Sequence, residues 1–194
     1  MRFFRALIRA FPFLSFLAFL LLCLPPLHAL ALLLSLFSHE CAHVLAFLLL
    51  GEPRPTLSFH NLGLLLHPSR PLSYGRDMLV TLAGPIGGFF LCLPFVCLLP
   101  RTFAEALFVA SASLSLFHLL PLLPLDGGRF LFLLFCLLMG PHSGALASRA
   151  LSFTLVSLLL FFSLYSLLYG GEGLPLMTFS LFLLFYHEKE NFLT

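Results

Sequence analysis

An apolar run from Leu27 to Leu50 carries three ionisable side chains near its centre, in the segment SHECAHV (residues 38–44). As a helix this run would be about 36 Å long, which exceeds the roughly 30 Å hydrocarbon core of a bilayer. An ionisable side chain inside such a span costs about 2.5–3.5 kcal/mol on insertion scales, so its presence indicates a specific task. His39 and His43 are four residues apart and therefore share one face of the helix.

The whole sequence has the composition of a membrane protein. Of its 194 residues, 60% are hydrophobic and 9% are charged, with a mean hydropathy of +1.08. Soluble proteins carry about 25% charged residues, and a water-soluble domain could not cover itself with so few polar side chains. A soluble enzyme, a nucleic-acid binder and a disordered chain are therefore excluded. The five cysteines lie in apolar runs without a Cys-x-x-Cys pair, so no disulfide framework is expected.

Six apolar regions predict an all-α polytopic membrane protein with six crossings. The fourth region is too long for one straight helix and is broken by Pro121, Pro124 and Gly127-Gly128, so it is counted once. The six regions are 11–24, 27–50, 78–99, 103–139, 151–169 and 174–186. We expect residues 1–194 to form a single membrane-embedded domain.

The basic residues predict the orientation of these crossings. If the N-terminus is cytoplasmic, eight of the ten Lys and Arg residues fall in cytoplasmic segments, whereas the outer loops keep only Arg101. This bias agrees with the positive-inside rule. The cytoplasmic segments are 1–10, 51–77, 140–150 and 187–194. We therefore expect a multi-pass protein of the cell membrane with both termini in the cytoplasm. The basic start also resembles a signal peptide, but the immediate second span favours an uncleaved first helix.

The pattern His-Glu-x-x-His at residues 39–43 is typical of a zinc site. Two imidazoles on one helix face can bind one zinc ion, and Glu40, about 100° round the helix from His39, can reach water beside the metal as general base. Catalytic zinc needs a third protein ligand, for which Asp126 is the candidate. The alternative for Asp126 is an ion pair with Arg129 in a cytoplasmic turn. The alternative for the motif is a set of polar residues hydrogen-bonded between helices.

Three motifs in this order resemble the site-2 protease family of intramembrane zinc metalloproteases. They are His39-Glu40-x-x-His43, Leu82-Ala83-Gly84-Pro85 and Pro124-Leu125-Asp126-Gly127-Gly128. Their order and spacing are similar to the stage IV sporulation protein FB type, whose members process a membrane-associated pro-sigma factor.

The resemblance implies one zinc ion per chain, held by His39, His43 and Asp126, with Glu40 as catalytic acid and base. It also implies a membrane-protein substrate that is cleaved near the cytoplasmic side of the bilayer, as in regulated intramembrane proteolysis. Unlike the sporulation type, the chain stops at Thr194, so no CBS domain is expected.

The chain departs from the family at three positions. His118 stands where the family usually has an asparagine that is thought to hold the substrate or transition state, so His118 is a candidate substrate-binding residue. Gly88 replaces a common Asn, and Ala42 replaces a frequent Gly. The exchange at position 118 leaves open an inactive family member that acts as a scaffold. A metal carrier is the other alternative, and it would not require Glu40.

Segment 56–67, TLSFHNLGLLLH, predicts two short strands about a His60-Asn61 turn. A re-entrant β-hairpin beside the active site can offer an edge strand to an unwound substrate. The family has such a sheet, so His60 and Asn61 are further candidate substrate-binding residues. An interfacial loop is the alternative. The expected partners are a membrane-protein substrate and the lipid bilayer, not nucleic acid. Regulatory membrane proteins or a homo-oligomer are left open.

The predicted orientation can be tested with reporter fusions along the chain. Fusions near Arg70 and Lys189 should report the cytoplasm, and fusions near Gly171 should report the opposite side, because the basic residues gather on the cytoplasmic side. An external Arg70 loop would contradict both the six crossings and the orientation.

Overall fold

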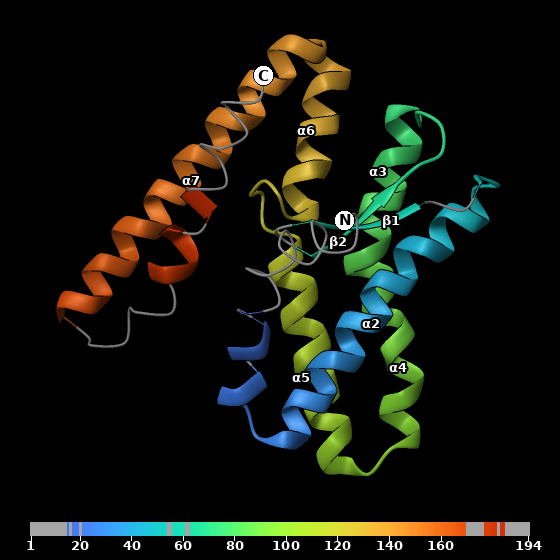
Figure 1. The fold of residues 1–194 in the computed structure, drawn as a ribbon, viewed down its shortest axis with the longest axis vertical. Coiled ribbons are helices and arrows are strands. Elements are labelled where there is room, and N and C mark those ends of the chain that lie inside the picture. Colours follow the sequence, from blue (N-terminus) through green and yellow to red (C-terminus); the bar gives the residue numbers. More distant parts are fainter. Residues whose placement is uncertain are drawn as a thin grey trace, which may run out of the picture. The chain divides into compact units, whose positions relative to one another are not determined.

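The computed structural model describes residues 15–184, apart from 16, 20, 54–55, 61–62, 170–176 and 182. The chain divides into two compact units, residues 1–119 and 120–194. Helices make up most of the described part of each unit, and one small sheet belongs to the first (Figure 1).

Helix α2 (Pro26–Leu49) is the centre of the first unit. It begins at Pro26, where the fixed φ of proline suits the first helical turn and its missing N–H leaves no donor unpaired. Every other helical segment of this unit from residue 74 onward packs against it. These segments are α3 (Tyr74–Leu82), the π-helical segment η1 (Ala83–Gly87), α4 (Gly88–Leu98) and α5 (Arg101–His118).

Small residues let α2 and its neighbours approach closely. Ala31 is fully buried in a core cluster with Cys92, Ala106 and Leu107. Along the same contact with α5, the hydroxyl oxygens of Ser35 and Ser111 lie 2.9 Å apart. Helices in lipid usually associate through small side chains and through hydrogen bonds between hydroxyl groups across the interface. Burial of apolar surface does not drive this association, because lipid tails are themselves apolar.

A two-stranded antiparallel sheet follows α2 in the chain. Strand β1 (Thr56–His60) pairs with β2 (Gly63–His67), and His60 is the register partner of Gly63. His60 is therefore the last residue of β1, and its predicted place in the turn is wrong. An alternating sequence pattern predicts where strands lie more accurately than it predicts where they end. Asn61 lies outside the described residues. That the hairpin is re-entrant stays a prediction.

In the second unit, α6 (Asp126–Met139) and α7 (Pro141–Tyr169) pack against each other. Gly140 alone separates them, with a φ of 86° that glycine adopts without strain. Gly144 is buried where α7 leaves this turn, and a Cβ added there would lie 2.4 Å from the backbone nitrogen of Cys136. The two helices therefore meet backbone to backbone at this point.

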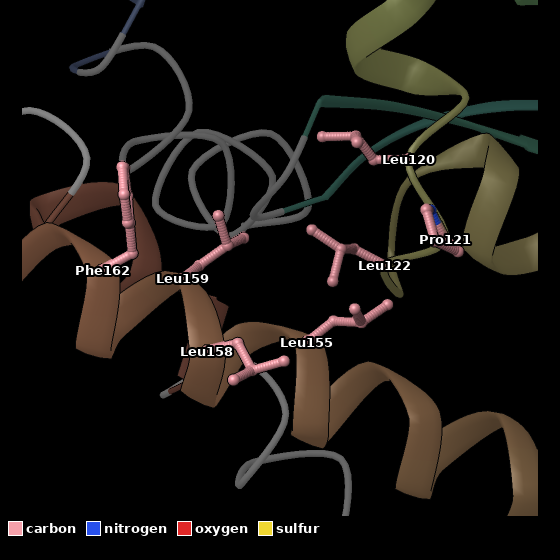
Figure 2. A pocket seen from close by; sticks show the side chains of 7 residues that line it. All are labelled: Leu120, Pro121, Leu122, Leu155, Leu158, Leu159 and Phe162. Atoms are coloured by element: carbon pink, nitrogen blue, oxygen red, sulfur yellow. The ribbon is translucent and has the colours of Figure 1, made fainter.

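An apolar pocket of about 320 Å³ lies in the second unit, between the segment that precedes α6 and one face of α7 (Figure 2). Its lining consists of leucines, one proline and one phenylalanine: Leu120, Pro121, Leu122, Leu155, Leu158, Leu159 and Phe162. A binding site for a specific ligand needs a few convergent polar groups. The side chains of this lining supply none.

Three described helical stretches are long and apolar enough to cross a membrane: Pro26–Leu49, Tyr74–Phe95 and Pro141–Tyr169. They agree with the predicted membrane protein, and the full count of six crossings stays a prediction. One boundary differs from expectation. Helix α7 begins at Pro141, whereas a span from residue 151 was predicted, so most of the expected cytoplasmic connection 140–150 is helical.

The contact at Gly144 predicts a sharp difference between two glycine substitutions. Gly144→Ala should lower the free energy of unfolding by about 1–3 kcal/mol, because its methyl group would collide with backbone atoms that cannot turn aside. Gly75→Ala in α3 is the matched control, since a Cβ there meets nothing within 4 Å. Unfolding of the detergent-solubilised protein measures both, and equal effects would contradict the proposed contact.

Candidate metal centre

The two histidines of α2 turn their Nε2 atoms toward one another. His39 and His43 are buried, with 2% and 7% of their surfaces exposed. Their Nε2 atoms lie 3.3 Å apart, and the rings meet edge to face with centroids 4.9 Å apart. The spacing of one helical turn accounts for this geometry. Two imidazole nitrogens directed at one place are the beginning of a zinc site.

The backbone of α3 fixes the tautomer of His43. Its Nδ1 lies 2.8 Å from the carbonyl oxygen of Val80. A carbonyl oxygen only accepts, so Nδ1 must carry the hydrogen and donate it. In the neutral ring the lone pair is then on Nε2, the atom that faces His39. Metal-binding histidines usually donate their second ring nitrogen in this way, which orients the ring and raises its basicity.

Gly84 of η1 leaves open the space in front of these nitrogens. A Cβ at this position would lie 2.1 Å from Nε2 of His43 and 2.9 Å from Cε1 of His39. Any side chain would therefore occupy the place that a ligand of His43 Nε2 needs. The donor set and this opening fit a zinc ion, which requires neutral imidazole nitrogens and room for further ligands.

The glycines after Pro85 hold η1 and α4 close to α2. A Cβ at Gly88 would lie 2.7 Å from the Cα of His39, and one at Gly87 would lie 3.1 Å from the Cβ of Ala42. These glycines therefore permit close packing of η1 and α4 against α2. The π-helical form of η1 is typical of functional sites, where an extra residue in a turn re-aims the backbone.

One further predicted residue of the first unit, His118, lies beside this pair. His118 is the last residue of α5, and its ring centroid is 4.2 Å from that of His39, with the rings tilted by 56°. The structure therefore brings His118 to the histidine pair although it is far away in the chain. Glu40 is half-buried and follows His39 in α2. His60 is the last residue of β1.

Asp126 is the first residue of α6, in the second unit, and it is half-buried. A carboxylate is favoured there by the partial positive charge of a helix N-terminus. The glycines after it were expected to break the helix, but Gly127 and Gly128 lie within its first turn. Gly128 is needed because the preceding segment folds back on it: a Cβ there would lie 2.3 Å from the carbonyl carbon of Leu122. This packing fixes the backbone that presents Asp126.

Comparison with known proteins shows a similarity at the level of structure. No protein-family profile and no curated protein sequence matches this chain. Among solved structures, it is similar to the site-2 protease from Methanocaldococcus jannaschii, with a TM-score of 0.63 and 21% sequence identity, over 84% of this chain and 77% of that one. The chain has the site-2 protease fold. At this identity the likeness establishes the fold alone.

Two parts of the candidate centre could not be read from the sequence. The acceptor at Val80 is a backbone carbonyl oxygen, which every residue type has. The identity of the side chain at this position therefore does not predict the hydrogen bond. The contact of Gly84 with the imidazoles was also missed, because a glycine in an apolar helix predicts close packing without naming the partner. Both features depend on how η1 and α3 lie on α2.

The opening at Gly84 predicts that Gly84→Ala abolishes metal binding. The added methyl group would lie within van der Waals contact of His43 Nε2 and exclude an ion there. Zinc content after purification should fall from about one ion per chain to a small fraction of that. Gly87→Ala, in the same η1 segment, is the matched control and should keep its zinc, because its Cβ touches only Ala42. Full zinc retention in Gly84→Ala would disprove this position for the metal.

Proposed function

We propose that this chain is an intramembrane zinc metalloprotease of the site-2 protease family. The observation that carries the proposal is the pair of buried imidazoles whose Nε2 atoms converge, with the tautomer of His43 set by Val80 and the ion's space left open by Gly84. The site-2 protease fold supports it. Zinc peptidases combine a metal centre with a nearby carboxylate that acts as a base, and Glu40 supplies such a carboxylate next to His39 in the sequence.

In this proposal His39, His43 and Asp126 hold one zinc ion. Each of the three offers one ligand atom of a type that zinc accepts, an imidazole nitrogen or a carboxylate oxygen. Zinc, when held there, supplies Lewis-acid polarisation of the scissile carbonyl group and makes water more acidic. Two neutral imidazoles and one carboxylate leave a fourth position open, as catalytic zinc requires.

Glu40 has the role of general base. Its carboxylate takes a proton from the attacking water and then returns it to the leaving amine of the cleaved peptide bond. Glu40 follows His39 and is offset by about 100° from the direction of that side chain, so it does not compete for the metal.

His118 completes the proposed site on the side of His39. A neutral imidazole has one N–H donor, which can hold a carbonyl oxygen of the substrate where the family uses an asparagine. The substrate is a membrane-spanning or membrane-associated protein. It must lose helix locally, because a helical amide is enclosed by its own turn. The β1–β2 hairpin, with His60 and Asn61, is proposed to receive the unwound segment as an added strand.

The location of the site implies where cleavage occurs. His43 is seven residues from Leu50, about 10 Å along the helix axis, toward the end of α2 that is predicted to be cytoplasmic. The product is therefore expected to leave on the cytoplasmic side of a multi-pass cell-membrane protein whose two termini are cytoplasmic.

The decisive experiment compares wild type with Glu40→Gln against candidate single-span substrates, by co-expression and with purified protein. Glutamine keeps the size and much of the hydrogen bonding of glutamate but is no base. The variant should insert, fold and retain zinc, and cleavage should fall by at least about 100-fold. It should also trap substrate, because binding does not need the base.

Cys41→Ser, next to Glu40 in the same helix, is a control that leaves the proposed base and ligands in place. It should keep activity close to wild type. A metal carrier has no use for a base. Cleavage by Glu40→Gln at a rate near that of the wild type would therefore contradict the protease mechanism and favour the carrier or scaffold alternatives.

A further inference from the structure

Glu52 is rigidly attached to the end of the helix that carries the two histidines. Its backbone N–H donates to the carbonyl oxygen of Phe47, and that of Gly51 donates to Leu48. Together with the φ of 69° at Gly51, these two bonds form a Schellman motif at the end of α2. The position of Glu52 is therefore fixed by the backbone of α2.

The carboxylate of Glu52 is buried and bound by two arginines. Only 4% of its side-chain surface is exposed. Nε of Arg70 donates to Oε2 at 2.7 Å, and Nη1 of Arg76 donates to Oε1 at 2.5 Å. Arg70 lies between β2 and α3, and Arg76 lies in the first turn of α3. The Glu52 clamp, as we call these three residues, thus joins the end of α2 to the segment after β2 and to the start of α3.

Arg76 occupies a place that its own helix disfavours. It is the third residue of α3, where the helix dipole opposes a positive charge. The contact with Glu52 compensates for this. The hydrogen bond from Arg70, followed by that from Arg76, lowers the pKa of Glu52, and burial opposes them. The clamp therefore stabilises the fold at pH values above the ordinary glutamate pKa and is lost as pH falls through the lowered pKa of the folded state.

The clamp and the metal centre are joined by one turn of α3. From Arg76 to Val80 is four residues, about 6 Å along the helix. Val80 is the residue whose carbonyl oxygen accepts the hydrogen bond from His43. Helices α2 and α3 are thus linked twice, by Glu52 with Arg76 at one end and by His43 with Val80 near the other. Loss of the first link would hold the start of α3 less firmly on α2, and the second link needs an accuracy of a few tenths of an ångström.

We propose that Glu52 is a positioning residue for the metal ligand His43: through Arg76 it fixes α3 on α2 and so keeps the Val80 carbonyl group on Nδ1 of His43. The inference rests on the proposed zinc protease function. Glu52 touches neither metal nor substrate in this scheme. It acts through the helix that carries the acceptor, and the partner of a metal ligand typically sets metal affinity by a factor of 10–100.

The test uses the full-length protein in detergent, with zinc affinity measured by chelator competition and ligand geometry by the visible absorption of the cobalt-loaded form. Glu52→Gln and Arg76→Gln should each lower metal affinity about tenfold and change the cobalt spectrum. Their kcat should fall with little change in KM, because the defect lies at the metal. Arg76→Lys keeps the charge and should recover most of the loss.

Two control variants separate this route from a general effect of charge. Arg101→Gln removes an exposed ion pair with Glu105 in α5, and it should leave metal affinity unchanged. Arg70→Gln removes the hydrogen bond to Glu52 from the residue that lies outside α3. Its loss of metal affinity should therefore be smaller than that of Arg76→Gln. Equal losses in Arg70→Gln and Arg76→Gln would overturn the route through α3.

The reciprocal exchange Glu52→Arg with Arg76→Glu, made together with Arg70→Gln, covers the case in which a single variant fails to fold. It restores the pair of residues 52 and 76 with its charges reversed and removes the like charge at position 70, and recovery of zinc affinity over the single variants at 52 and 76 would support the proposal. If the wild-type protein binds zinc and cleaves substrate, and Glu52→Gln has the same zinc affinity and cobalt spectrum, the positioning role is refuted and the proposed function is not. Absence of zinc binding by the wild type would refute the proposed function itself.

Discussion

The hydrogen bond from Nδ1 of His43 to the carbonyl oxygen of Val80 is the contact on which the candidate metal centre depends. It settles which nitrogen of the ring can bind a metal, and it satisfies a polar atom that would be costly to bury without a partner. The bond exists because α3 and η1 come to backbone distance of α2. Glycines at positions 84 and 88 permit that approach, since a Cβ at either would collide with the histidines.

Two pairings of buried polar groups fix neighbouring segments of the first unit on one another. Near the middle of α2, Ser35 bonds to Ser111 of α5. At its end, Glu52 takes two guanidinium groups on one buried carboxylate. In a chain with 9% charged residues, each such pairing also fixes the relation of two helices, because an apolar surface alone does not prefer one rotation over another in lipid.

The second unit presents Asp126 by a different device. Asp126 opens α6, where the helix dipole favours a carboxylate. The segment before it is tied down at both sides: Leu122 lies against Gly128, and the backbone N–H of Leu123 donates to the hydroxyl of Ser152 in α7 at 3.1 Å. A side chain that is to serve as a metal ligand benefits from such a rigid support, because a misplaced ligand loses affinity rapidly.

What the sequence determined by itself is local. The bounds of α2 were predicted within one residue, and the spacing of four between His39 and His43 was enough to put them on one face, because helical periodicity fixes neighbours along a helix. Two short strands were predicted around a turn at residues 60 and 61, whereas His60 still belongs to β1 and pairs with Gly63. Alternation of side chains along the sequence locates a strand better than it locates the end of the strand. The partners of those histidines were decided by tertiary structure alone. Val80, Gly84 and His118 lie 37 to 79 residues from them, and only the packing of α3, η1 and α5 on α2 selects which atoms meet the rings.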